Sequence, residues 1–112
     1  MINDSKIESS LKLFKALCDE TRLKIIIEIL EGEKAVCKIR DIVGKSQPTI
    51  SLQLSKLEEL GIVQSKREGR SIFYKIINPK IYDILEIAFD IKIDRKNIEA
   101  KLNDCCKISE EK

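Results

Sequence analysis

The sequence predicts one small domain that is mainly α-helical, with a minor β component. Apolar residues recur at helical spacing through most of the chain, and alternating β-branched and aromatic residues replace them around Glu68 and Gly69. A chain of 112 residues also suits a single hydrophobic core. We therefore expect one folded domain over residues 1–104, followed by a cysteine-containing tail over residues 105–112.

The first two helices are predicted from their apolar residues. From Ser5 to Leu17 these residues recur at i, i+4, i+7 and i+11, which is typical of an amphipathic helix. Asp19 is the predicted N-cap of a second helix, Glu20 to Glu31, which is apolar nearly all round and ends at Gly32. A helix of that composition belongs at the centre of the domain.

Two shorter helices follow, with a tight break between them. The third helix has its apolar face within residues 36–43, and Gly44 lies in the break after it. Ser46 is the predicted cap of the fourth helix, which carries Pro48 in its first turn and Gly61 just after its end. Two short helices joined by a glycine-containing turn are the outline of a helix-turn-helix.

The chain then changes to the pattern of a β-hairpin. Residues 62–67 and 70–77 are rich in β-branched and aromatic residues, and Glu68-Gly69 is the predicted turn between them. Asn78-Pro79 ends the second strand, and a last helix is predicted through about Asn103. The order helix, helix, helix-turn-helix, hairpin, helix is that of a winged helix-turn-helix, in which the hairpin is the wing.

The outward face of the fourth helix is the predicted functional surface. Ile50, Leu54 and Leu57 would face inward, which leaves an opposite face that is small, polar and free of acids up to Glu58. Residues 33–75 carry nine positive and five negative charges, a net +4 in a chain whose net charge is +2. Positive charge is thus concentrated where a DNA-reading helix and wing need it, whereas one such face alone is also typical of a solvated helix.

Specific roles follow from side-chain chemistry. Gln47 and Gln53 can hydrogen-bond base edges, Ser51 can reach bases or phosphate, and Leu52 can meet a thymine methyl group. The nearby lysines and arginines supply affinity that weakens with salt. The predicted DNA-contacting residues are Lys45, Ser46, Gln47, Thr49, Ser51, Leu52, Gln53, Ser55, Lys56, Lys66, Arg67 and Arg70.

The composition excludes several kinds of site. The chain has no histidine, so it has no histidine general base, no Ser-His or Cys-His nucleophile and no imidazole zinc site, and we expect no enzyme. No uncharged run approaches the ~20 residues of a membrane helix, and Met1 begins no apolar secretion segment. We therefore expect a cytoplasmic protein with no membrane partner and with free thiols at its four cysteines.

Three stretches carry linked motifs. Residues 16–26 read ALCDETRLKII and are similar to ALxDxTRLxIL, residues 46–63 are similar to SQPTVSxxLxxLxxxGLV, and residues 67–74 match RxGRxxxY. Together they resemble the ArsR/SmtB family of dimeric winged-helix repressors over about residues 11–91. The resemblance implies a homodimer formed by the first and last helices, bound to a palindromic operator and released by an inducer. The expected interface residues are Ile7, Leu11, Ile84, Ile87 and Ile91.

The sensing site departs from the family pattern. Arsenic-sensing members carry ELCVCDL where residues 33–39 read EKAVCKI, so Cys37 remains and the other thiolate position does not. The histidine-based zinc site of other members is excluded by composition. Cys37, Cys105 and Cys106 can hold As(III), Sb(III) or a soft divalent metal through thiolates, although no cofactor is required.

Two other hypotheses for the cysteines stay open. One is a redox switch at Cys105 and Cys106, and in the other Cys18 and Cys37 are small buried apolar residues and the tail cysteines have no role. The competing hypothesis for the whole domain is a winged-helix protein-interaction module that buries its fourth helix against a partner protein and binds no DNA.

Overall fold

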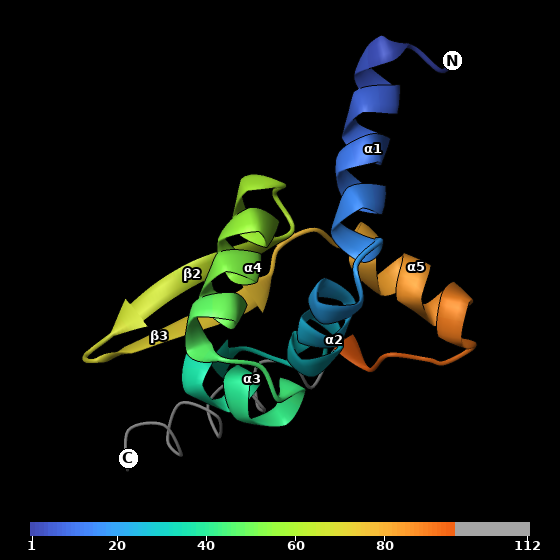
Figure 1. Ribbon diagram of the computed structural model, residues 1–112. Coiled ribbons are helices and arrows are strands. Elements are labelled where there is room, and N and C mark those ends of the chain that lie inside the picture. Colours follow the sequence, from blue (N-terminus) through green and yellow to red (C-terminus); the bar gives the residue numbers. More distant parts are fainter. Residues whose placement is uncertain (96–112) are drawn as a thin grey trace.

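The structure is a computed structural model that describes residues 1–95. Figure 1 shows a long first helix standing away from a helical body, from which a β-hairpin extends on another side. This is the predicted winged helix-turn-helix order. No helix in the described part is long and apolar enough to cross a membrane. The elements are α1 (Asp4–Leu17), α2 (Glu20–Ile29), β1 (Lys34–Ala35), α3 (Val36–Val43), α4 (Gln47–Glu59), β2 (Val63–Glu68), β3 (Ser71–Ile76) and α5 (Lys80–Phe89).

The inward face of α4 is at the centre of the hydrophobic core. Ile50, Leu54 and Leu57 have no exposed surface, as predicted. They belong to one cluster with Ile39 of α3 and with three isoleucines of α2, Ile25, Ile26 and Ile29. The central position predicted for the second helix is confirmed, although α2 ends at Ile29. Because the core fixes which side of α4 is buried, it also fixes which side faces outward.

Side-chain caps begin α2 and α4 where the sequence predicts them. The Asp19 carboxylate accepts a hydrogen bond from the Arg22 amide at 3.0 Å. Ser46 Oγ accepts one from the Thr49 amide at 3.4 Å. Gly44 has φ 78°, a left-handed conformation that ends α3 and that glycine adopts without strain. Local chemistry therefore sets the break between α3 and α4.

The hairpin is paired with a third, unpredicted strand. The sheet order is β1-β3-β2, and Lys34 and Ala35 of β1 lie opposite Tyr74 and Phe73 of β3. A strand of two residues has no sequence periodicity to predict it. The hairpin turn is also one residue later than expected: Glu68 still pairs with Ser71, so Gly69 (φ 60°) and the following arginine make the turn.

The last helix is shorter than predicted. Asp90 adopts a left-handed conformation (φ 54°) and caps α5 after Phe89, so the predicted continuation is wrong for residues 90–95, and residues 96–103 lie outside the described chain. Ile93 is buried in the core, and its amide donates to Glu86 Oε2 at 2.9 Å. The apolar residues beyond Phe89 fit a helical spacing, but burial of Ile93 requires the chain to turn back.

We predict that Leu54→Ala lowers the free energy of unfolding by about 2–5 kcal/mol, because it leaves a cavity under α4. Leu52→Ala, on the same helix but 56% exposed, is the matched control and should change it by less than about 0.5 kcal/mol. Urea unfolding of both variants at one protein concentration measures the difference. Equal losses would mean that α4 is seated differently.

Candidate nucleic-acid interface

The exposed side of α4 carries a polar stripe. Gln47, Ser51 and Ser55 lie four residues apart, so they follow one another along the helix surface, and all three are exposed. Leu52 and Lys56 are exposed beside them. The helix has no acidic residue before Glu58 in its last turn. The stripe therefore presents donors and acceptors without repelling a polyanion.

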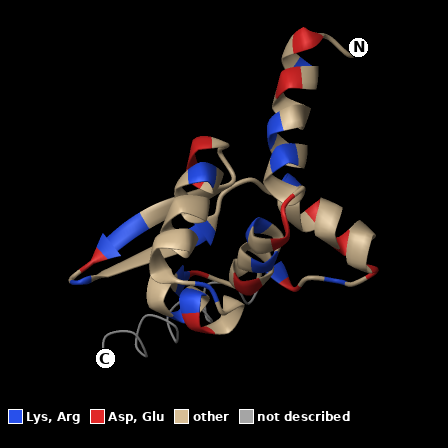
Figure 2. Cartoon of the chain, viewed as in Figure 1, with Lys and Arg blue, Asp and Glu red and all other residues tan. Residues whose placement is uncertain are grey.

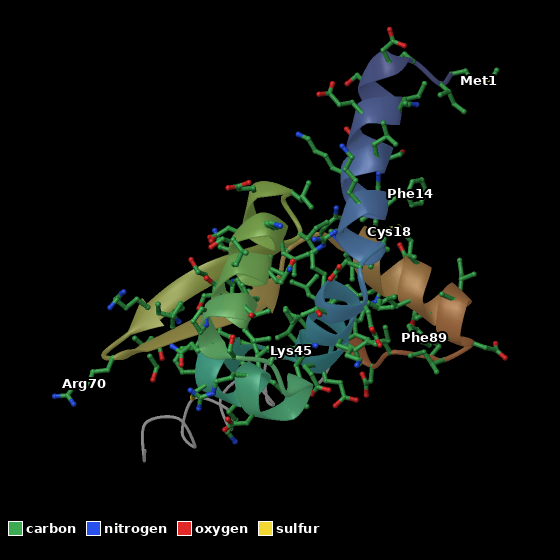
Figure 3. All side chains as sticks on the ribbon, in the orientation of Figure 1. Met1, Phe14, Cys18, Lys45, Arg70 and Phe89 are labelled. Atoms are coloured by element: carbon green, nitrogen blue, oxygen red, sulfur yellow. The ribbon has the colours of Figure 1, made fainter. Side chains whose placement is uncertain are left out.

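The wing adds positive charge. Lys66 and Arg67 are exposed on β2, and Figure 2 shows basic residues along this strand and at the tip. Arg70 points outward at the end of the hairpin, and Lys45 lies in the turn before α4 (Figure 3). Lys66 is partly neutralised, because its Nζ lies 2.8 Å from the Glu68 carboxylate. The strongest positive electrostatic potential of the wing is therefore expected at its tip.

A hollow of about 270 Å³ joins the stripe to the wing. Its lining brings together four predicted DNA contacts with a cysteine and with the buried face of the hairpin. Ser71, which the sequence did not single out, adds a hydroxyl next to the tip. The one sequence signal for Ser71 is its position directly after Arg70. The lining residues are Ala35, Val36, Cys37, Gln47, Ser51, Ser55, Arg70, Ser71, Ile72 and Tyr74.

A carboxylate at the end of α4 holds the wing in place. Glu58 Oε2 accepts hydrogen bonds from the Ser65 amide at 3.2 Å and from Ser65 Oγ at 3.0 Å. Tyr74 lies behind the hollow in the core, where burial, and then the charge of Glu58, raise the pKa of its phenol. Tyr74 is thus a neutral core residue that supports the wing.

Gln47 is oriented by an arginine of α3. Arg40 Nη1 donates to Gln47 Oε1 at 2.8 Å, while its Nε and Nη2 contact Asp41 Oδ1 at 3.2 and 3.1 Å. A guanidinium has donors and no acceptor, so it must face the amide oxygen of Gln47. The Gln47 amide N–H₂ group is then left for a ligand. Arg40 was missed because its partner lies in another helix.

Gln53 has a different environment. It is half-buried, and its Oε1 accepts a hydrogen bond from Arg22 Nη1 of α2 at 3.1 Å. Gln53 lies on the α2 side of the helix, apart from the stripe of Gln47 and Ser51. The expected base contact therefore has a competing role inside the protein.

Two more predicted contacts serve the cap of α4. Ser46 Oγ and Thr49 Oγ1 lie 2.9 Å apart, and Ser46 also accepts from the Thr49 amide. Their hydroxyls are thus already hydrogen-bonded at the exposed N-terminal end of the helix.

Comparison with known proteins identifies the kind of interface. The sequence profile of the bacterial regulatory protein, arsR family, matches residues 19–65. A probable mercury resistance operon repressor of Streptomyces lividans is 33% identical over 99 residues, which cover 88% of this chain and 76% of the relative. The chain belongs to the arsR family.

Two solved structures have the same fold. The AntR antimony-specific transcriptional repressor superposes with a TM-score of 0.73 and 28% identity, covering 80% of this chain and 81% of its own. A homodimeric winged helix-turn-helix DNA-binding domain from Mycobacterium bovis superposes with a TM-score of 0.69 and 27% identity, covering 80% and 88%. Membership of the arsR family makes the protein a DNA-binding transcriptional regulator, and the matched residues contain all of α4.

Outside the arsR-family match, α1, α5 and the segment just after α5 expose apolar residues. Ile7 and Leu11 are each 49% exposed, Ile87 is 83% exposed and Ile91 is 48% exposed. These are four of the five residues expected at a dimer interface. The fifth, Ile84, is half-buried and packs against the core of its own chain.

The free side of α1 is more apolar than the predicted residues alone suggest. The buried residues of α1 are Leu13 and Ala16, near its C-terminal end, while Phe14 is 58% exposed. Figure 3 shows Phe14 at the side of α1, and Phe89 at the end of α5 is 47% exposed. Phe14 follows Ile7 and Leu11 at helical spacing, and this spacing predicts that it lies on the same side of α1 as they do.

The cysteines form no metal site within the described residues. No group of three or more potential metal-ligating side chains lies together there. Cys18 is exposed, Cys37 is half-buried in the lining of the hollow, and Cys105 and Cys106 lie outside residues 1–95.

Proposed function

We propose that this protein is a transcriptional repressor that binds a palindromic operator as a homodimer. The observation that carries the proposal is the hollow between α4 and the wing, whose walls combine Gln47, Ser51 and Ser55 with Arg70. In this arrangement one sugar-phosphate backbone of the DNA runs along the hollow. On one side of it α4 enters the major groove, and on the other side the wing contacts the flanking duplex.

Base and phosphate contacts divide between the two walls. Gln47 presents its amide N–H₂ group outward, which suits acceptors on base edges, and Ser51 lies one turn further along. Lys45, Lys56 and the wing cations contact phosphates and give affinity without sequence preference. Protein-interaction modules need neither the acid-free stripe nor the basic tip.

The apolar faces of α1 and α5 form the homodimer interface in this proposal. Ile7, Leu11, Ile87 and Ile91 carry the exposed surface that a second copy would bury. A two-fold dimer sets its two α4 helices into successive major grooves, about 34 Å apart, and so matches a palindrome.

The inducer in this proposal is a thiol-binding metalloid or soft divalent metal. The names of an antimony-specific and a mercury-resistance repressor among the similar proteins support this class, and Cys37 lies in the lining of the hollow. Cys105 and Cys106 would complete a set of three thiolates, which is the donor type that soft ions prefer.

We predict that Gln47→Ala weakens binding to the operator by about 1–3 kcal/mol and leaves binding to random duplex unchanged, because it removes a base contact. Arg70→Ala should weaken both alike and reduce the salt dependence. Titration onto a duplex of the protein's own upstream region, at two salt concentrations, measures both. Equal losses for Gln47→Ala on both duplexes contradict its reading role, and no binding by the wild type favours the interaction module.

We predict that Ile87→Glu converts the dimer to a monomer, because the dimer would have to bury an unpaired carboxylate. Ile42→Glu is the matched control, since Ile42 is 53% exposed on α3, away from both interface helices. Analytical ultracentrifugation at one concentration distinguishes them. A dimeric Ile87→Glu variant would move the interface elsewhere.

We predict that arsenite releases the reduced repressor from its operator and that the Cys105→Ser/Cys106→Ser variant resists release. Cadmium is the second probe, in a separate titration, and peroxide is the third, which tests the redox hypothesis. Release by peroxide alone, lost in the Cys105→Ser/Cys106→Ser variant, assigns Cys105 and Cys106 to a redox switch. Indifference to all three probes means that the cysteines are not the sensor.

A further inference from the structure

Arg22 connects three helices at one point. It lies in the first turn of α2, its Nη1 donates to Gln53 Oε1 of α4 at 3.1 Å, and its Nη2 donates to the backbone carbonyl of Lys15 in the last turn of α1 at 2.9 Å. Its own backbone amide is held by the Asp19 cap. Both the backbone and the side chain of this arginine are therefore fixed.

The chemistry of the guanidinium makes this connection directional. It is planar and holds its N–H donors in a rigid fork, so two bonds in one plane fix the separation of their acceptors. Carbonyls of the last helical turn carry partial negative charge, which makes Lys15 O a favourable acceptor. Arg22 Nε is buried and has no hydrogen-bond partner among the described residues, a cost that two charge-assisted bonds must offset.

Helical geometry places Gln53 on a different side of α4 from the polar stripe. Gln53 and Ser51 are two residues apart, and therefore roughly 160° apart around the helix. Gln53 is half-buried with its amide oxygen turned to Arg22, whereas Gln47 is exposed at the start of the stripe.

We propose that Arg22 is a positioning residue, which ties the orientation of α4 to α1 through Gln53, and that Gln53 reads no base. This rests on the proposed function, in which α1 belongs to the dimer interface and α4 enters the groove. An operator demands two α4 helices at a fixed separation and tilt, but non-specific binding does not. Loss of the connection therefore lowers the preference for operator over random duplex.

A double-mutant cycle tests this. Arg22→Met and Gln53→Met should each lower the ratio of operator to random affinity by about tenfold, and the double variant should be no worse than Arg22→Met alone. Dimerisation, by ultracentrifugation, should not change. Lys24→Met, which removes an exposed cation from the same helix, is the matched control and should keep the ratio within about twofold.

Two further variants separate positioning from simple loss of folding. Gln53→Glu keeps an acceptor for Arg22 but has no amide N–H₂ group, so it should preserve the operator-to-random ratio even if its added charge weakens both affinities. Arg22→Lys keeps the charge without the fork and should lose part of the ratio while remaining folded.

The opposite results overturn the inference. Multiplicative losses for Arg22→Met and Gln53→Met, or a Gln53→Glu variant as unselective as Gln53→Met, would make Gln53 a base reader independent of Arg22. A wild-type protein that binds no operator refutes the proposed function itself, and this inference with it.

Discussion

The seating of α4 on the core is the constraint on which the rest of the structure depends. Ile50, Leu54 and Leu57 are completely buried, so the helix cannot rotate without exposing aliphatic surface or burying its polar stripe. The packing of this face therefore determines which side chains of α4 are exposed to solvent. The wing then follows, because Glu58 at the end of the same helix holds the Ser65 backbone.

The exposed apolar surface has a related cause. A chain of this size buries a limited share of its surface alone, and α1 contributes Leu13 and Ala16 to the core while Phe14 stays exposed. In the proposed homodimer, the exposed apolar side of α1 is buried against the second copy. Arg22 of α2 hydrogen-bonds both α1 and α4, so in the proposed dimer it links the interface helix to the orientation of α4.

The predictable features are those with local causes. Caps at Asp19 and Ser46, the break at Gly44 and the inward face of α4 all follow from neighbouring residues, and the structure confirms each. Strand β1 and the early end of α5 at Phe89 depend on contacts with distant parts of the chain. Helical spacing continues through Ile91, but the burial of Ile93 overrides it.

The two glutamines of α4 show why site residues are harder to predict than the fold. Composition treats Gln47 and Gln53 alike, because either amide can pair with a base. Each accepts a hydrogen bond from an arginine of another helix. Arg40 is partly exposed, so the N–H₂ group of Gln47 stays at the surface. Arg22 belongs to α2 and holds the half-buried Gln53 on that side of α4. In the proposed roles, Gln47 contacts a base and Gln53 positions α4, and the difference follows from the arginine that faces each amide oxygen. The role of a glutamine on this helix therefore depends on the donor that faces its amide oxygen. That donor comes from another helix, so the sequence of α4 alone does not predict it.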